Sequence, residues 1–344
     1  MGNPSLSEWE KLYQITNQFQ KVSPWTWMAN GDLFAVVNPQ NDEVGYCSIL
    51  GNGKEEYGLA IFLGDKGYKR YLSIFSDEPG VGDFDETIMT PALSLLFANR
   101  TDLQKQDIKV IRSLGLQFRG KNAWPLFRSQ KPGYAPWFLE KEEAIFLTAA
   151  VKQALVVAGR VRRNGLDLYE GVDEDLVFTR YYSDGKWKED WRKPEFSQRI
   201  SSKSPEESTS IVNEAEMFLL RNSSRKQGGS WELDICVLPT PIGQKSVRPY
   251  FPLCCLAVER QQGMVIGVEM NEPWITPFQQ REMIIKILKN AGQLPGDILV
   301  NSKKVKEILA PIAKSLGISL QVGTTPKLEK FKTSLDAHLS GSEA

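Results

Sequence analysis

The sequence predicts an α+β protein in two parts: an N-terminal antiparallel meander with helices, and a C-terminal mixed α/β sheet flanked by helices. Three observations predict this. Three short apolar runs separated by turn-forming segments follow one another between residues 33 and 63. Residues 140–163 form the most apolar helix candidate in the chain, and such a helix needs other elements to cover it. Beyond residue 230, strand-like and helix-like runs alternate.

Composition narrows the possible functions. A chain of 344 residues is long enough for two domains, each with an ordinary core. Basic and acidic residues number 42 each, and this balance argues against a dedicated nucleic-acid binder, which usually carries a basic excess. The single histidine, His338, argues against Ser–His–Asp triads and histidine zinc sites unless it reaches a cleft.

Several features favour a cytoplasmic protein that does not enter a membrane. The first residues lack the basic and apolar segments of a secretory signal. Lys152 and Gln153 interrupt the longest apolar run, which argues against a membrane-spanning helix. The four cysteines form no C-x-x-C pair, so we expect buried, reduced thiols.

The N-terminal part, residues 1–163, is predicted as one α+β domain. Ser7 is predicted to cap the first helix with Glu10 as its capping-box partner, and Ser23-Pro24 to end it. The further elements predicted here are strands at 33–37, 44–50 and 57–63, a helix from Gly64, a helix through Leu93, Leu96 and Phe97, a helix at 103–114, and the long helix ending near Arg163, stopped by Asn164-Gly165.

Residues 164–230 are predicted to hold a hairpin, a helix and a linker. LVFTRYY and WKEDW flank the turn at Asp184-Gly185. Ser204-Pro205 is typical of a helix start, and 221–230 is rich in linker residues. The inward stripe of that helix is predicted to be Ile211, Ala215, Phe218 and Leu219.

The C-terminal domain is predicted at 231–344, with a flexible tail. Its expected elements are strands at 231–238, 253–259 and 264–269, a helix at 277–291, a strand at 298–300, a helix at 305–316 and a strand at 318–322.

The segments WELD, LAVERQQGMVIG, AGQLPGDILVNS and LGISL resemble, in order and spacing, a ribonuclease-H-like core of the integrase type. The resemblance implies two-metal phosphodiester cleavage, in which carboxylates converge on Mg²⁺ or Mn²⁺. Asp234 stands where the first acid is expected, but Asn301 stands where a second aspartate is expected. Glu329 is the only nearby candidate for a third acid, in a lysine-rich setting.

We therefore predict a sheet without a complete metal site, and no cofactor. The alternative is a divergent metal-dependent phosphodiesterase or nuclease, with Mg²⁺ or Mn²⁺ held by Asp234 and further acids. The candidates for those acids are Glu259, Glu269 and Glu282.

A second candidate site is a stretch in which basic and aromatic residues alternate. Flat rings beside cations suit a peptide's aromatic groups or stacked bases. The alternative is a long loop held down by its own rings, with the cations at its rim. The candidate ligand-binding residues are Arg119, Lys121, Trp124, Arg128, Tyr134 and Trp137.

PWTWM, the NP…GYC hairpin, FRGKNAWPLFRSQKPGYAPWFL and RPYFP are similar to a family of uncharacterised bacterial two-domain proteins. This resemblance implies no activity. The leading hypothesis is a binding or interaction protein that uses the aromatic–basic stretch and an interdomain groove, with a protein or peptide partner favoured and nucleic acid possible. The alternatives are the phosphodiesterase and a structural subunit of a larger assembly.

Overall fold

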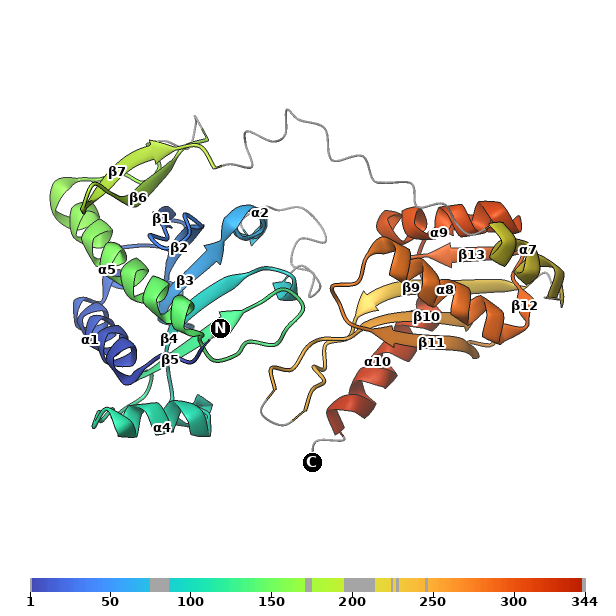
Figure 1. The fold of residues 1–344 in the computed structure, drawn as a ribbon, viewed down its shortest axis with the longest axis horizontal. Helices are drawn as coiled ribbons and strands as arrows, with labels where there is room; N and C mark the ends of the chain where they lie inside the picture. Colours follow the sequence, from blue (N-terminus) through green and yellow to red (C-terminus); the bar gives the residue numbers. More distant parts are fainter. Residues whose placement is uncertain are drawn as a thin grey trace. The chain divides into compact units, whose positions relative to one another are not determined.

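The computed structural model describes residues 2–74, 87–170, 175–194, 214–223, 225–226, 229–244 and 247–341. The chain divides into two compact units (Figure 1). The first comprises Met1–Pro132 and Pro136–Ser204, and the second comprises Pro205–Ala344 together with the tripeptide Gly133–Ala135. Each unit is built on its own sheet, and the chain is α+β, as predicted. Both sheets are mixed, whereas only the C-terminal sheet was predicted to be so.

The first unit contains a seven-stranded sheet in the order β5-β4-β3-β2-β1-β6-β7. Its neighbours are antiparallel except for β1 and β6, which are parallel. The predicted meander is confirmed as β1–β3, and the predicted hairpin is β6–β7. The strands are β1 (Phe34–Val37), β2 (Val44–Leu50), β3 (Gly58–Leu63), β4 (Ala92–Ala98), β5 (Trp124–Gln130), β6 (Val177–Ser183) and β7 (Lys186–Arg192).

Helix α5 (Lys141–Asn164) crosses one face of this sheet and forms its main core with α1 (Leu6–Val22), η1 (Pro24–Thr26) and α4 (Lys105–Ser113). Leu147, Val151 and Val157 of α5 are fully buried in that core. Burying each such side chain contributes about 1.5–3 kcal/mol. A capping box at Glu140 begins the helix, and left-handed Gly165 ends it. α2 (Gly64–Ile74) packs on the opposite face of the sheet, and η2 (Arg100–Asp102) follows β4.

By length and composition alone, α5 is long and apolar enough to cross a membrane. The interruption of its apolar run by Lys152 and Gln153 therefore does not exclude a membrane-spanning helix. The packing of α5 distinguishes it from a membrane-spanning helix. Half of its most apolar segment is buried inside the protein, and Ala150, Ala154 and Ala158 are wholly covered. In the described part of the chain, α5 is therefore the core helix of a sheet protein.

Three predictions for the first unit were wrong. Residues 92–98 form strand β4 rather than a helix, with Leu93, Leu95 and Phe97 alternating inward. Strand β5 lies in the stretch interpreted as an aromatic–basic loop, and it pairs with β4 along its length. A short apolar run such as 92–98 fits the repeat of a helix as well as that of a strand, and pairing with β3 and β5 decided for a strand. The first helix is capped by Ser5 and Glu8, not by Ser7 and Glu10, so it gains an extra half turn.

The second unit contains a five-stranded sheet in the order β11-β10-β9-β13-β14. β9, β10 and β11 are antiparallel, whereas β9, β13 and β14 run parallel. This is the predicted ribonuclease-H-like element order. The elements are α7 (Glu214–Ser223), β8 (Arg225–Lys226), β9 (Ser230–Val237), β10 (Leu253–Glu259), β11 (Val265–Asn271), α8 (Pro277–Ala291), β12 (Gln293–Leu294), β13 (Asp297–Val300), α9 (Lys303–Leu316), β14 (Ser319–Val322) and α10 (Pro326–Gly341).

The two faces of this second sheet are covered differently. α8 packs on the face that carries Gly267, where an added Cβ would lie 3.0 Å from Ile287. α10 packs on the other face, against Leu256 and Val258, through its fully buried Leu328. No helix was predicted after residue 322, where only a flexible tail was expected. Residues 326–341 form α10, which supplies few apolar side chains, so this helix was not evident before its docking surface was known.

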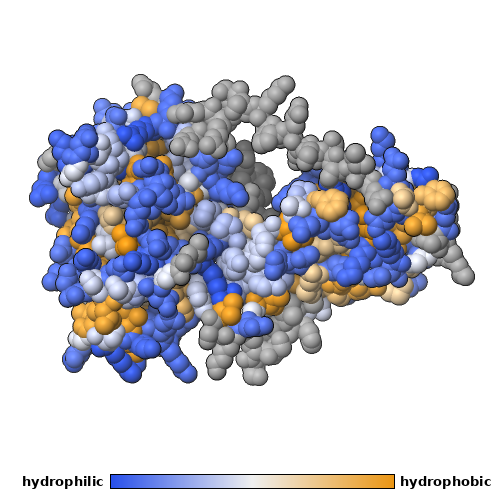
Figure 2. Space-filling model, in the orientation of Figure 1, coloured by the Kyte–Doolittle hydropathy of each residue, from blue (hydrophilic) through white to orange (hydrophobic). Residues whose placement is uncertain are grey.

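Two other predictions for this region need correction. The inward residues of α7 are Met217 and Leu220, whereas Phe218 and Leu219 are each 66% exposed. Figure 2 shows apolar surface over α7. The predicted linker contains β8, which pairs in parallel with β12. The predicted helix start at Ser204-Pro205, and Ile211, lie outside the described residues.

Candidate functional site

Asp234 lies in the middle of β9, the central strand of the second sheet, and is only 2% exposed. Glu232 precedes it by two residues, so both side chains project from the same face. That face is the one that α10 covers. Two carboxylates are therefore buried beneath one helix.

Three groups of the protein bind the Asp234 carboxylate. Its Oδ2 accepts a hydrogen bond of 2.7 Å from the Asn301 side-chain amide and pairs with Lys332 Nζ. Its Oδ1 accepts from the Ile235 backbone N–H at 2.8 Å. Lys332 Nζ also donates to Glu329 Oε1 at 3.0 Å. Asp234, Asn301 and Glu329 thus gather around a lysine ammonium; we call these four residues the Asp234 cluster.

The fold explains how this cluster forms. Asn301 directly follows β13, which runs parallel to β9. Val300 of β13 is paired with Leu233 of β9. Parallel strands end at the same edge, so Asn301 arrives beside Asp234. Glu329 and Lys332 are three residues apart on α10, which places them on one face of that helix.

Electrostatics favour a charged lysine at this position. Burial acts to lower the pKa of Lys332, but the negative charge of Asp234 and the hydrogen bonds to Asp234 and Glu329 outweigh it and raise that pKa. The ammonium supplies the positive charge that a divalent ion would bring, and Asn301 adds no second negative charge. In the described chain no three His, Cys, Asp or Glu side chains converge as metal ligands do. These residues do not fit a divalent cation.

Glu232 also binds α10. Its Oε2 accepts a hydrogen bond of 2.9 Å from the Leu328 backbone N–H in the first turn of the helix, where a negative charge is favourable. Its Oε1 and the Thr325 Oγ1 are buried without a partner among the described residues. Both acids of WELD therefore bind the helix that covers them.

The other acids proposed as metal ligands lie elsewhere in the second unit. Glu259 ends β10 and accepts from the backbone N–H groups of Gln261 and Gln262 at 2.8 and 2.6 Å, which lower its pKa. Glu269 of β11 pairs with Lys286 at 2.5 Å. Glu269 is opposite Cys255, whereas Asp234 is opposite Leu256, so the two acids are on opposite faces. Glu282 is exposed on α8.

The aromatic–basic stretch does not form one surface. Arg128 makes a bidentate ion pair with Asp107 at 2.9 and 2.8 Å, and both side chains are largely buried. Trp124 packs on Phe118 with ring centroids 5.8 Å apart. Trp137 pairs through its backbone with Ser129 at the edge of β5.

Of the remaining three candidates, Arg119 and Lys121 are exposed. Tyr134 belongs to the second unit. There it stacks on Trp274, with ring centroids 4.6 Å apart and an interplanar angle of 18°. The stretch that was predicted as one binding loop is thus divided among a strand, a buried ion pair and a second cluster.

Tyr134 is part of an aromatic cluster inside the second unit, made of Tyr134, Arg248, Tyr250 and Trp274. The Arg248 guanidinium lies 5.5 Å from the Tyr134 ring and donates to the Ala135 carbonyl at 3.1 Å. Tyr250 meets Trp274 edge-on at 5.5 Å, and 42% of Trp274 is exposed. The tripeptide Gly133–Ala135 and the segment RPYFP, both within sequence motifs quoted above, therefore meet here. Arg248, Tyr250 and Trp274 were not predicted as site residues, because only the fold joins them to Tyr134.

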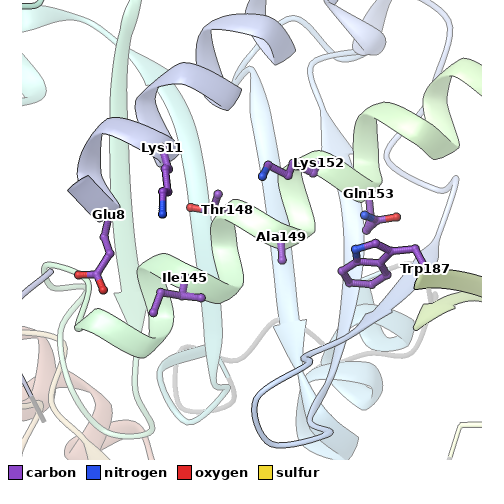
Figure 3. Close-up of a pocket in the computed structure, with 8 residues that line it drawn as sticks. All are labelled: Glu8, Lys11, Ile145, Thr148, Ala149, Lys152, Gln153 and Trp187. Atoms are coloured by element: carbon purple, nitrogen blue, oxygen red, sulfur yellow. The ribbon is translucent and has the colours of Figure 1, made fainter. Parts of the chain in front are cut away.

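The first unit contains a pocket of about 360 Å³ between α1, α5 and β7 (Figure 3). Figure 3 shows one end beneath α1 and the other beside the indole of Trp187. No sequence motif marked this pocket, because its residues come from three distant elements. They are Glu8, Lys11, Ile145, Thr148, Ala149, Lys152, Gln153 and Trp187.

Among solved structures, the chain is similar to the catalytic core domain of BIV integrase, with 17% sequence identity and a TM-score of 0.26. The likeness covers 34% of this chain and 72% of that one. Comparison with curated proteins finds no match.

Two family matches cover most of both units. Residues 9–180 match the family described as Domain of unknown function (DUF7309), and residues 217–336 match a Domain of unknown function (DUF6930). The first match spans half of the 344-residue chain. The protein therefore belongs to the DUF7309 family and carries a DUF6930 domain in its second unit.

Proposed function

We propose that this protein is a non-catalytic cytoplasmic binding protein whose partner is a protein or peptide. The observation that carries the proposal is the ion pair of Lys332 with Asp234, the acid on which a metal-dependent reaction would depend. Asn301 and Lys332 together occupy Oδ2 of this carboxylate. Without that oxygen and a second converging acid, the sheet is a scaffold.

Displacing Lys332 would be costly. Removing one partner of a buried pair costs about 3–5 kcal/mol unless another charge takes its place. Lys332 is held by α10, which is also anchored by Leu328 in the core and by Glu232 at its N-terminus. A metal ion would have to overcome all three attachments.

The aromatic cluster is the surface that we assign to the partner. Trp, Tyr and Arg are the residue types that contribute most to protein–protein binding. Here they lie together, and Trp274 retains 42% exposure. The zero net charge favours a protein or peptide over nucleic acid.

Catalysis is tested by incubating the full chain with labelled single- and double-stranded DNA and RNA in Mg²⁺ or Mn²⁺. We expect no cleavage. Metal-dependent cleavage that disappears in Asp234→Asn would overturn the proposal and favour the phosphodiesterase alternative.

Binding is tested by selecting peptides from a displayed library on the wild-type chain. We expect selected peptides to bind Trp274→Ala at least tenfold more weakly. They should bind normally to Phe278→Ala, which changes another exposed ring of the same unit. Equal binding to wild type and Trp274→Ala, or no selected peptide, would remove the cluster as the partner surface.

A further inference from the structure

The pocket of the first unit presents hydrogen-bond donors that the protein does not use. Lys11 of α1 and Lys152 of α5 both line it and are exposed. Figure 3 shows the two side chains reaching from their separate helices toward the same space. Among the described residues, neither ammonium is paired with a carboxylate.

Gln153 adds a donor whose direction is set by the protein. The residue is only 4% exposed, and its Oε1 accepts a hydrogen bond of 3.1 Å from Arg180 Nε. Arg180 is fixed in turn by its ion pair with Glu189. Because the oxygen faces Arg180, the Nε2 amide faces away from it, and it has no partner within the described chain. It is a donor on the pocket wall, carried by a largely buried side chain.

Among the described residues that line the pocket, Glu8 is the one acid, and it is already engaged. The Glu8 carboxylate accepts from the Ser5 backbone N–H at 2.6 Å and lies 3.7 Å from Lys141. Hydrogen bonds from the backbone and the hydroxyl of Ser5 lower its pKa, so it stays ionised and committed to the helix start. The lysines therefore outnumber the acids that line the pocket.

The rest of the lining suits a flat ring. Trp187 stands as an aromatic wall at the end beside Gln153, and Ile145 and Ala149 form an apolar strip along α5. Thr148 Oγ1 donates to the Ala144 carbonyl at 2.7 Å, so its hydroxyl oxygen is left as an acceptor. A volume of about 360 Å³ lies at the small end of the range for ligand pockets.

From these contacts we infer that the pocket between α1, α5 and β7 binds a small anion that carries a flat ring. Its carboxylate or phosphate group pairs with Lys11 and Lys152, and its ring lies against Trp187, where Gln153 Nε2 donates to a ring or ring-substituent acceptor. This site is independent of the aromatic cluster in the second unit, and it stands if that cluster binds nothing.

The test is calorimetric titration of the full chain with two kinds of probe, at 50 and 300 mM salt. One arm uses the four nucleoside monophosphates, and the other uses aromatic carboxylates such as indole-3-acetate. Uncharged nucleosides, which keep the ring, and inorganic phosphate, which keeps the charge, are the fragments used as controls. We expect one arm to bind, more weakly at high salt, and each fragment to bind at least tenfold more weakly than the whole probe.

Variants locate the site. Lys11→Gln and Lys152→Gln should each weaken binding about tenfold, because each removes a charge-assisted contact. Lys21→Gln is the control, since it alters an exposed lysine of the same helix outside the pocket. Absence of binding by both arms at millimolar concentration, or equal losses in Lys11→Gln and Lys21→Gln, would overturn the inference.

Discussion

The Asp234 cluster and the pocket of the first unit differ in whether their polar groups are already paired within the protein. In the cluster, Asp234 is surrounded by Asn301, Lys332 and a backbone N–H, all from the protein. In the pocket, Lys11 and Lys152 are open to solvent and Gln153 keeps one free donor in the described chain. We infer that the cluster stabilises the fold and that the pocket is available to a ligand.

Burial explains the difference. A charge removed from water must be paired, so the protein completes the partners of Asp234 before any ligand arrives. A charge at the rim of an open pocket remains hydrated and needs no internal partner. Mutations should therefore affect stability in the first case and ligand binding in the second.

The largest expected effect comes from breaking the cluster. Lys332→Met should lower the free energy of unfolding of the second unit by about 3–5 kcal/mol, since it leaves Asp234 buried and uncompensated. Urea unfolding with hydrogen exchange along β9 measures this. Lys330→Met, on an exposed position of the same helix, should change stability by less than about 0.5 kcal/mol. A loss below about 1 kcal/mol for Lys332→Met would mean that the ion pair does not hold α10.

The next effect concerns Arg128, a predicted ligand-binding residue that the fold uses internally. Arg128→Met should destabilise the first unit by about 3 kcal/mol, because Asp107 then loses its bidentate partner at a largely buried site. The exposed Arg119→Met should be nearly neutral. Thermal unfolding of both variants distinguishes them, and equal melting temperatures would contradict a structural role for Arg128.

A smaller effect tests whether the cluster can become a metal site. Asn301→Asp places a second carboxylate beside Asp234 and should cost about 1–2 kcal/mol through like-charge repulsion, only partly relieved by Lys332. Addition of 10 mM Mg²⁺ (about the upper end of common assay conditions) should not restore this loss while Lys332 is present. Melting curves with and without Mg²⁺ decide the point. A selective rise for Asn301→Asp would show that one substitution recreates a cation site.

The smallest expected change in stability is in the pocket. Lys11→Gln and Lys152→Gln should alter the free energy of unfolding by less than about 0.5 kcal/mol, because both side chains are exposed and unpaired in the described structure. The same urea experiment applies. A loss comparable to that of Lys332→Met would place these lysines among the structural residues instead.

Much of the secondary structure was predictable because its signals are local. The bounds of β2, β10 and α8 agree with prediction to the residue. Thr276 caps α8 with Pro277 at the first helical position, and Asp184-Gly185 adopts the left-handed turn of the predicted hairpin. Each of these signals lies within a few residues of the element that it delimits.

Where prediction failed, the deciding partner was far away in the chain. β4 is a strand because β3 and β5 lie on either side of it, and β5 escaped notice because Pro125 and Arg128 obscure its alternation. α10 has too few apolar residues to indicate a buried helix, yet Leu328 is fully covered by the sheet. The same limit applies to the site: the resemblance to an integrase-type core placed Asn301 near Asp234, but it did not place Lys332 there.

Turn residues, caps and hydrophobic period were thus enough to predict the strands of the second sheet and, apart from β4 and β5, those of the first. These signals depend on neighbours in sequence. The partner of Asp234, the dispersal of the aromatic–basic stretch and the pocket between α1, α5 and β7 depended on packing. Lys332 and Asp234 are 98 positions apart, and Arg128 and Asp107 are 21 apart. In the pocket, Trp187 and Glu8 are 179 positions apart. Contacts at such separations are selected by the burial and pairing energies of the whole fold, which no local pattern encodes.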